Sequence, residues 1–343
     1  MTLWSMALWI IILSVAVFFA WFVIEKSRRR SHPVTGGLDT SKTIEHQEKF
    51  ELYANSFSHC SRKTCLTLEE LGIDYIYHPI DLIETGWYQT ISPAYLRINP
   101  AGLLPTLVHD GHPVYESDDI LAYAAKAAGT HAPQLVPGDE ALRNEMNHWL
   151  DFCSISSGDP LGEMATKAGA CIPGLTMPLF VTAIPFIPLR KILVGFLFHP
   201  DKKRPAFFTA AKLFGLQKMM SQKPVQGMVF ASRDHMVEHL KAIDTRLRER
   251  KADWIVGDTY CLADISISCL LLRLDETGWF SYFRKAHDLE ALELYFHRLK
   301  DRPSWQAAIE NRAHPIIEQA KRDLATLTGQ SDDLYRLVYS GTR

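Results

Sequence analysis

The strongest constraint on this chain is an uncharged apolar run near its N-terminus, residues 3–24. Inside a bilayer, a single segment satisfies its backbone hydrogen bonds by forming a helix. The 22 residues of the run, at a rise of about 1.5 Å each, span about 33 Å, which is enough for a hydrocarbon core of about 30 Å. A cleaved signal peptide is the alternative, but no basic residue precedes the run and no Ala-x-Ala site follows it. The sequence therefore predicts a transmembrane anchor over residues 1–24.

Basic residues follow this anchor directly, at Lys26, Arg28, Arg29 and Arg30. The positive-inside rule then predicts a single-pass protein whose remaining chain lies on the cytosolic side. Residues 25–47 are polar and contain Pro and Gly, which is typical of a flexible linker. Nothing in the sequence indicates which membrane is used.

The rest of the chain is long enough for about two domains, and its composition, 47% hydrophobic and 22% charged, is typical of folded proteins. A net charge of −2, without a basic stripe, argues against a nucleic-acid partner. The six cysteines have no metal-ligand spacing and indicate reduced, intracellular thiols. His235 and His239 share a helical face but lack a third ligand, so we interpret them as a solvated pair and predict no metal site.

A predicted strand, residues 50–54, is followed by a turn and by a helix whose apolar residues recur every three to four positions. Ser58 and Cys60 fall at this turn, where the positive end of the helix dipole favours a thiolate and welcomes an anion. Ser58 could instead be only a helix cap, and Cys60 only a small buried side chain. His59 and Lys63 could lower the pKa of this thiol through their charges or could be solvated, and for Lys63 we favour a solvated charge.

Two further motifs follow. Residues 99–107 contain Leu104-Pro105, where Pro105 stands at the start of a strand. Residues 114–120 contain Glu116-Ser117 followed by two aspartates, the pattern of a helix start. Taken alone, Pro105 could be an ordinary strand-entry proline and Ser117 a helix cap.

In this order, the motifs at residues 56–63, 99–107 and 114–120 resemble the glutathione S-transferase superfamily. The Ser-x-Cys-Ser pattern at residues 58–61 is similar to the zeta class and to the tetrachlorohydroquinone reductive dehalogenases. The resemblance implies an α/β thioredoxin-like glutathione-binding domain over residues 48–129 and an all-α substrate domain over residues 138–325. It also implies glutathione as cosubstrate.

The resemblance also assigns roles to individual residues. The peptide group of Leu104, before a Pro105 that is cis in the family, would pair with the cysteinyl backbone of glutathione. Glu116 would pair with the ammonium of the γ-glutamyl end of glutathione, and the Ser117 hydroxyl would bind the carboxylate of that end. Ser58 would orient the glutathione thiolate, while Cys60 would support it or form a mixed disulfide with glutathione.

The helical part contains one landmark and one irregular region. Asp264 resembles the residue that caps a buried helix in the family's second domain. Residues 165–223 form an insertion whose stretch 172–189 carries four prolines, so we expect a loop or short helices there that cover the substrate cleft or touch the membrane. A long insertion at this place also resembles the ganglioside-induced differentiation-associated protein 1 group. Residues 326–343 are predicted to be a loose tail.

These features predict a membrane-anchored enzyme that activates glutathione as a thiolate, for conjugation to, or reductive dehalogenation of, a small hydrophobic electrophile. A non-catalytic membrane-tethered scaffold and a glutathione-dependent thiol-disulfide reductase are the alternatives. The identity of the electrophile and the formation of a homodimer stay open at this level.

Overall fold

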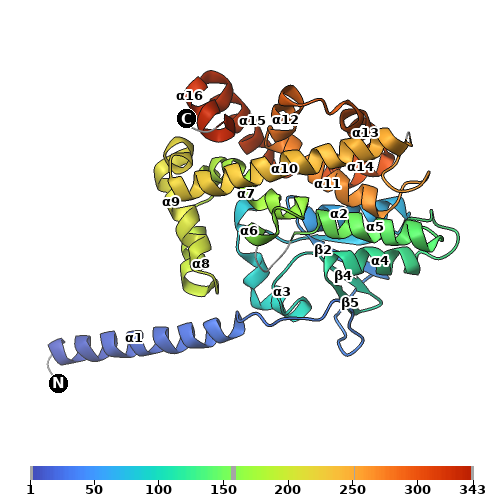
Figure 1. Ribbon diagram of the computed structural model, residues 1–343. Helices are drawn as coiled ribbons and strands as arrows, with labels where there is room; N and C mark the ends of the chain where they lie inside the picture. The colour runs from blue at the N-terminus through green and yellow to red at the C-terminus, as the bar shows by residue number, and fades with distance from the viewer. Residues whose placement is uncertain (1–2, 156–159, 251, 341–343) are drawn as a thin grey trace.

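The computed structural model describes residues 3–155, 160–250 and 252–340. A mixed sheet with its helices precedes a larger helical region, and a long helix, α1, projects from the body (Figure 1). The expected thioredoxin-like domain followed by an all-α domain is therefore confirmed.

The sheet has the strand order β1-β5-β4-β2-β3, in which β2 and β3 are parallel and the other neighbours antiparallel. Its strands are β1 (Gly37–Leu38), β2 (Phe50–Ala54), β3 (Ile76–Pro79), β4 (Thr106–His109) and β5 (His112–Tyr115). Asp110 and Gly111, both with positive φ, form the two-residue turn between β4 and β5. The helices of this domain are α2 (His59–Glu70), α3 (Pro93–Ile98) and α4 (Ser117–Ala127), with short 3₁₀ turns at Ile83–Thr85 and Gln89–Ile91.

Strand β1 corrects the expectation of a flexible linker over residues 25–47. Gly37 pairs with Tyr115 and Leu38 with Val114, so this segment extends the sheet beyond β5. Further along, the Ile44 N–H donates to the Gly111 carbonyl at 2.7 Å. The outer edge of β5 would otherwise present unpaired backbone groups, and covering such an edge is favourable. The sequence signal was polar composition, which says nothing about pairing to a distant strand.

The helical region is built around α11 (Leu262–Glu276), in which every residue except Asp275 is buried. Its other helices are α5 (Glu140–Cys153), α6 (Pro160–Glu163), α7 (Ala168–Ala183), α8 (Leu189–Phe198), α9 (Lys203–Met220), α10 (Lys223–Arg250), α12 (Trp279–Ala286), α13 (Glu290–Lys300), α14 (Pro303–Ala308), α15 (Pro315–Gln330) and α16 (Asp332–Tyr335). Helix α11 contacts α2, α5, α7 and α12, so it joins the two domains. As expected, Asp264 caps the start of α11 by accepting from the Cys261 N–H at 2.8 Å and the Ile255 N–H at 3.0 Å.

Helix α7 corrects the expectation of a loop or short helices at residues 172–189. It continues through Pro173 and Pro178, and most of its residues are buried. An interior proline costs about 3 kcal/mol in a helix. Here that cost is offset because α7 packs against α10 and α15 in the core.

The C-terminal residues correct the expectation of a loose tail. After α16, the chain forms a single π-helical segment, Arg336–Ser340, in which Val338 and Tyr339 are buried. The Tyr339 hydroxyl donates to the Thr277 carbonyl at 2.8 Å, and its ring lies 4.8 Å from that of Trp279. Aromatic packing therefore holds this segment on the body, although its polar composition favoured a tail.

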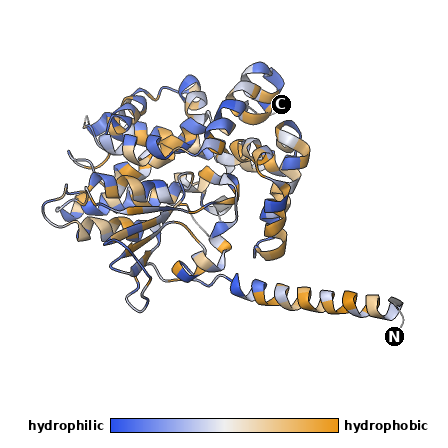
Figure 2. Cartoon of the chain, turned by 180° about the vertical axis from the view of Figure 1, so that it is seen from behind, coloured by the Kyte–Doolittle hydropathy of each residue, from blue (hydrophilic) through white to orange (hydrophobic). Residues whose placement is uncertain are grey.

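Helix α1 (Leu3–Arg28) is long and apolar enough to cross a membrane, and its candidate span is not buried in the body. Figure 2 shows that α1, coloured mostly as hydrophobic, extends away from the body. The segment Ala168–Phe186, which includes α7, has a similar length and composition but is 72% buried, as expected for a core helix.

Candidate functional site

Three chain segments meet at one end of the sheet. In the register, Tyr53 near the end of β2 pairs with Thr106 at the start of β4, and the end of β5 lies beside that start. The turn that follows β2, the loop that precedes β4 and the turn that follows β5 therefore share this end. These segments carry the predicted site residues Ser58 and Cys60, Leu104 and Pro105, and Glu116 and Ser117.

Ser58 is the N-cap of α2, and Cys60 is the second residue of that helix. The Ser58 hydroxyl oxygen accepts from the Ser61 N–H at 3.3 Å. This bond uses an acceptor lone pair, so the hydroxyl proton can still be donated to another group. Both side chains are half-buried, whereas the five other cysteines are buried. Cys60 is therefore the cysteine best placed to react.

Lys63 is buried, which corrects the interpretation of a solvated charge. Its ammonium forms an ion pair with the Asp118 carboxylate of α4, and that carboxylate also accepts from the Ser154 hydroxyl at 2.6 Å. Burial alone would lower the pKa of Lys63, but the charges of Cys60 and then Asp118 outweigh it and raise the pKa. The turn that carries Ser58 and Cys60 is thus tied to the start of α4 by a buried positive charge.

The loop before β4 is held in one conformation by side chains around it. The Leu104–Pro105 peptide is cis, as the resemblance implied. The Tyr95 hydroxyl and the Asn99 amide both donate to the Leu103 carbonyl, at 2.6 and 3.0 Å. Pro105 is buried, while Leu104 is only half-buried. The peptide group of Leu104 therefore lies on a loop that is held in one conformation.

Glu116 has an unusual backbone conformation, with φ of +61°. Non-glycine residues rarely adopt positive φ, and such strained positions cluster at functional sites. Its side chain is exposed, and Ser117 begins α4 directly after it. A cavity of about 430 Å³ lies alongside, between α4 and α5, with Asp118, Asp119 and Ser154 in its wall. Glu116 and Ser117 do not line this cavity, although it begins with the next two residues of α4.

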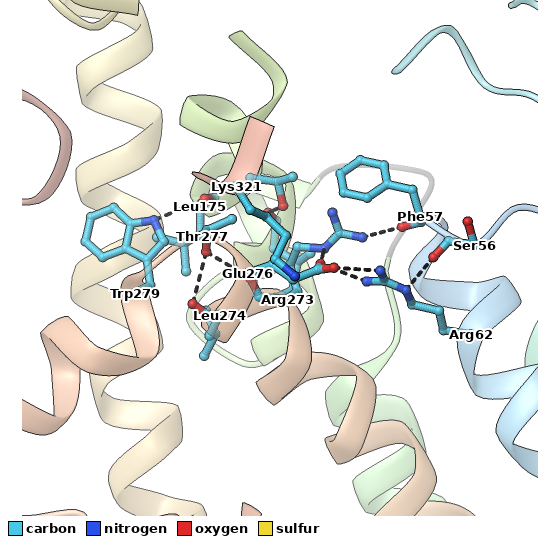
Figure 3. A network of polar contacts seen from close by, with 12 residues as sticks. Ser56, Phe57, Arg62, Leu175, Arg273, Leu274, Glu276, Thr277, Trp279 and Lys321 are labelled. Carbon is cyan, nitrogen blue, oxygen red and sulfur yellow. Dashed lines mark hydrogen bonds and ion pairs between the residues drawn. The ribbon is translucent and has the colours of Figure 1, made fainter. Parts of the chain in front are cut away.

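A buried network of charged residues binds the helical domain to the turn before α2 (Figure 3). The Arg62 guanidinium donates to the Ser56 carbonyl at 2.6 Å and to both carboxylate oxygens of Glu276, at 2.8 and 2.6 Å. Arg273 donates to the Phe57 carbonyl, and its guanidinium lies 3.8 Å from the centre of the Phe57 ring. Two residues of α11 therefore fix the backbone that leads into Ser58.

The network also sets the charges of its members. Burial alone would raise the pKa of Glu276, but the guanidinium groups of Arg62 and Arg273 outweigh it and hold the pKa below its ordinary value. Burial lowers the pKa of Arg273 to about 10. All three groups therefore stay charged at neutral pH.

Sequence reasoning favoured a solvated Lys63 over a role beside the thiol, and it missed Arg62, Arg273 and Glu276 as parts of this site. The two residues of α11 lie more than two hundred positions from Arg62, and no motif joins them. His239 also differs from expectation, because its ring is buried and its Nε2 lies 2.7 Å from the Met164 carbonyl oxygen, whereas His235 is exposed. In the described part of the chain, no group of three or more potential metal ligands is found.

The fold and the site together define a class, a thioredoxin-like domain joined to a helical domain with a polar turn at the interface. Residues 57–127 match the family described as "Glutathione S-transferase, N-terminal domain". Residues 57–127 therefore form a glutathione S-transferase N-terminal domain, and the resemblance inferred from the motifs is confirmed.

Curated relatives agree with this assignment. The chain is 31% identical over 110 residues to "Glutathione S-transferase F10" of Arabidopsis thaliana, covering 32% of this chain and 49% of the relative. It is 23% identical over 279 residues to "Tetrachloro-P-hydroquinone reductive dehalogenase" of Sphingobium chlorophenolicum, covering 75% and 94%. The chain spans about half the length of the first relatives it matches, 49% and 45%.

Solved structures show the same fold. The beta-etherase LigF from Sphingobium sp. strain SYK-6 aligns with a TM-score of 0.60 and 21% identity, over 77% of this chain and all of that one. The structure titled "Ure2p in complex with glutathione" aligns with a TM-score of 0.52 and 17% identity, over 78% of this chain and 95% of that one. Over the aligned 77–78% of its length, the chain therefore has the glutathione transferase fold.

Proposed function

We propose that this protein is a membrane-anchored, glutathione-dependent enzyme that activates glutathione as a thiolate for attack on a small hydrophobic electrophile. The observation that carries the proposal is the convergence of the α2 start, the cis Leu104–Pro105 loop and the Glu116–Ser117 turn at one end of the sheet. Similarity over 75% of the chain to a protein named as a reductive dehalogenase, and to several named glutathione S-transferases, supports it.

Glutathione would bind across these three segments. Its cysteinyl backbone would pair with the peptide group of Leu104, which lies on a loop held by Tyr95 and Asn99. The γ-glutamyl carboxylate would accept from the Ser117 hydroxyl and from backbone N–H groups at the start of α4, since a helix N-terminus favours an anion. Glu116 is exposed beside this position and would pair with the γ-glutamyl ammonium.

Ser58 would donate its hydroxyl proton in a hydrogen bond to the glutathione sulfur. Such a bond favours the thiolate over the thiol, and the N-terminal dipole of α2 acts in the same direction. Because Ser58 already accepts from Ser61, its oxygen is held in place while its proton remains available. The resulting thiolate is the nucleophile of a conjugation reaction.

Cys60 would supply the second chemistry, reductive dehalogenation. Its thiolate would attack the sulfur of a glutathione conjugate, forming a Cys60–glutathione disulfide and releasing the substrate carbon, which takes up a proton. A second glutathione thiolate would then release Cys60 and form glutathione disulfide. Buried Lys63, three residues further along α2, interacts electrostatically with Cys60.

Anchoring would place this site where apolar electrophiles concentrate. The length and composition of α1, and the absence of burial along it, support a single span. The basic residues after it, Lys26 and Arg28 among them, favour a cytosolic position for the body. Glutathione and reducing conditions are also found there.

Turnover of a chlorodinitrobenzene and of a chlorinated hydroquinone, each with glutathione, tests the proposal. Removing a positioned hydrogen-bond donor should lower kcat/KM for conjugation by about 100-fold, so this is the result expected for Ser58→Ala. Cys60→Ala should retain conjugation but lose dehalogenation and the glutathione mixed disulfide seen by mass spectrometry. Full activity of both variants would refute these assignments. A mixed disulfide without conjugation would instead favour a thiol-disulfide reductase.

A further inference from the structure

Helix α8 has two different faces. On one face Ile192 is fully buried, and Gly195 approaches Tyr88 so closely that a Cβ there would lie 2.6 Å from the ring. On the other face Leu189, Leu193, Phe196 and Leu197 are 44, 48, 38 and 42% exposed. These four positions are spaced by four, three and one residues, which places them on one side of the helix. Helix α8 therefore docks on the body and turns an apolar stripe, Leu189, Leu193, Phe196 and Leu197, outward.

One end of α8 contacts α1. The Phe198 ring lies 5.8 Å from the ring of Phe22 and 6.3 Å from that of Trp21, and the Arg29 guanidinium lies 4.9 Å from it. Phe22 precedes Glu25, the first charged residue of α1, by three positions, or about 4.5 Å along the axis. This contact therefore marks the depth at which the apolar part of α1 ends.

The two helices lie crosswise in the views of Figures 1 and 2. If α1 crosses a bilayer, its last apolar turn lies at the boundary between acyl chains and headgroups. A helix that meets α1 at that turn and runs crosswise to it then lies along the membrane surface. This is the placement of an in-plane amphipathic helix, with its apolar side toward the acyl chains.

Basic side chains lie at both ends of α8. Arg190 and Lys191 are in its first turn, and Lys202 and Lys203 follow its C-terminal end, with Asp201 as the acidic residue among them. Arg190, Lys202 and Lys203 are exposed, whereas Lys191 is half-buried with its Nζ 2.8 Å from the centre of the Trp87 ring. Exposed cations beside an apolar stripe match the anionic headgroups of a cytosolic leaflet. A lipid surface satisfies both the stripe and its basic flanks, whereas an apolar protein groove would satisfy the stripe alone.

We propose that α8 is a second membrane contact, an in-plane helix whose apolar stripe inserts into the headgroup–acyl boundary of the bilayer that α1 crosses. This inference rests on the membrane anchoring in the proposed function. Two contacts, one spanning and one in-plane, together fix the orientation of the body on the membrane surface.

Quenching of a fluorescent label by brominated lipids tests this contact in the full chain. In a Cys60→Ser background, the variant Leu193→Cys is labelled with a nitrobenzoxadiazole and reconstituted into phosphatidylcholine–phosphatidylserine vesicles. Phe196→Cys repeats the measurement on the same stripe. Leu294→Cys is the matched control, because Leu294 is 56% exposed on α13, a helix on the far side of the body from α8 (Figure 1). Val15→Cys, in the middle of α1, reports on the anchor.

Replacing the lipids by versions brominated in the acyl chains should reduce the fluorescence at positions 193 and 196 roughly twofold and leave position 294 unchanged. Quenching at position 15 without quenching at 193 and 196 overturns this inference and leaves the anchor intact. No quenching at position 15 contradicts the anchoring itself, and the inference falls with it. If the labels at 193 and 196 are not quenched by brominated lipids but their emission shifts to the blue at high protein density, a second copy covers the stripe. That result also overturns the inference.

Discussion

At the residue scale, the ion pair between Lys63 and Asp118 is unequally buried, because the Lys63 side chain is 2% exposed and the Asp118 side chain 41%. Asp118→Asn leaves a buried ammonium without its counter-charge, and we expect it to lower the free energy of unfolding by about 3 kcal/mol. Lys63→Met leaves a carboxylate that water and the Ser154 hydroxyl still solvate, so we expect a loss of about 1 kcal/mol. Urea titration of both variants in a mild detergent measures the difference.

The test is which of the two variants loses more stability, and we expect the larger loss for Asp118→Asn. Equal losses, or a larger loss for Lys63→Met, would mean that the ammonium is not buried as the structure has it. The pair Arg284 and Glu293 on the surface offers a control, since Glu293→Gln should change the stability by less than about 1 kcal/mol.

His59 should make the stability depend on pH. Burial, and then the positive charges of Lys63, Arg273 and Arg62, hold the pKa of His59 well below its ordinary value. Below about pH 6.5 the unfolded chain therefore binds a proton that the folded chain does not, and stability falls as the pH falls. The contribution of His59 approaches about 1.4 kcal/mol per pH unit.

A series of urea titrations between pH 7.5 and 5.5 (roughly the range in which a histidine titrates in the unfolded chain) measures this slope. His59→Asn cannot take up the proton, so its stability should fall less steeply with pH, whatever its value at neutral pH. Parallel slopes for the two proteins would show that His59 is not held neutral.

The sequence predicted the positions of Ser58, Cys60, Leu104, Pro105, Glu116 and Ser117 because each belongs to a local pattern of turn, strand entry or helix start. It did not predict the burial of Lys63 or His239. Whether a charged side chain on a helix faces solvent or core depends on what packs on that helix. The partner of Lys63, Asp118, lies on α4, and the Ser154 hydroxyl that donates to Asp118 follows the end of α5.

At the element scale, Gly169 tests how closely α7 approaches α5. A Cβ at Gly169 would lie 2.2 Å from the Ser154 carbonyl oxygen and 2.4 Å from that of Cys153, both backbone atoms that cannot turn aside. We expect Gly169→Ala to lower the free energy of unfolding by about 2 kcal/mol or more. Gly227 in α10 is the matched control, since a Cβ there meets nothing within 4 Å. Gly227→Ala should gain about 0.5–1 kcal/mol.

Opposite signs for the two glycines are the test. If Gly169→Ala leaves the stability unchanged, α7 does not approach α5 as closely as the structure has it. If Gly227→Ala lowers the stability, position 227 is not open. Melting temperatures of both variants, measured in the same detergent, decide this.

Regular elements with strong periodicity followed the sequence closely. The strand expected at residues 50–54 coincides with β2, and the helix expected after the next turn is α2. The sequence did not predict three other elements, namely helix α7, strand β1 and the C-terminal segment. Each is stabilised by tertiary contacts that override its prolines or its polar composition.

At the scale of the whole molecule, Glu276 couples the two domains. It is the carboxylate partner of Arg62, and it also lies near Arg273, with Arg273 Nε 3.5 Å from its Oε2. Glu276→Gln would leave two buried guanidinium groups without a counter-charge, and we expect a loss of about 3–5 kcal/mol. The same change should loosen the backbone at Ser56 and Phe57, so hydrogen exchange in that turn should rise more than in β3. An unchanged exchange rate in the turn would deny the coupling.

This network could not be read from the sequence, because its residues become neighbours only when α11 packs on α2. The domain order, in contrast, could be predicted from three local motifs. The residues that position the candidate site are therefore harder to predict from the sequence than the residues of the local motifs.

The central claim is that this chain binds glutathione at the end of the sheet, and calorimetric titration of the full chain in a mild detergent tests it most directly. The wild-type protein should bind, and Ser117→Ala should weaken the affinity about tenfold, because a hydroxyl donor to the carboxylate is lost. Ser331→Ala, which removes a helix-capping serine elsewhere, should leave the affinity unchanged. No heat of binding in the wild type at millimolar glutathione would contradict the account and leave a membrane-tethered scaffold as the better description.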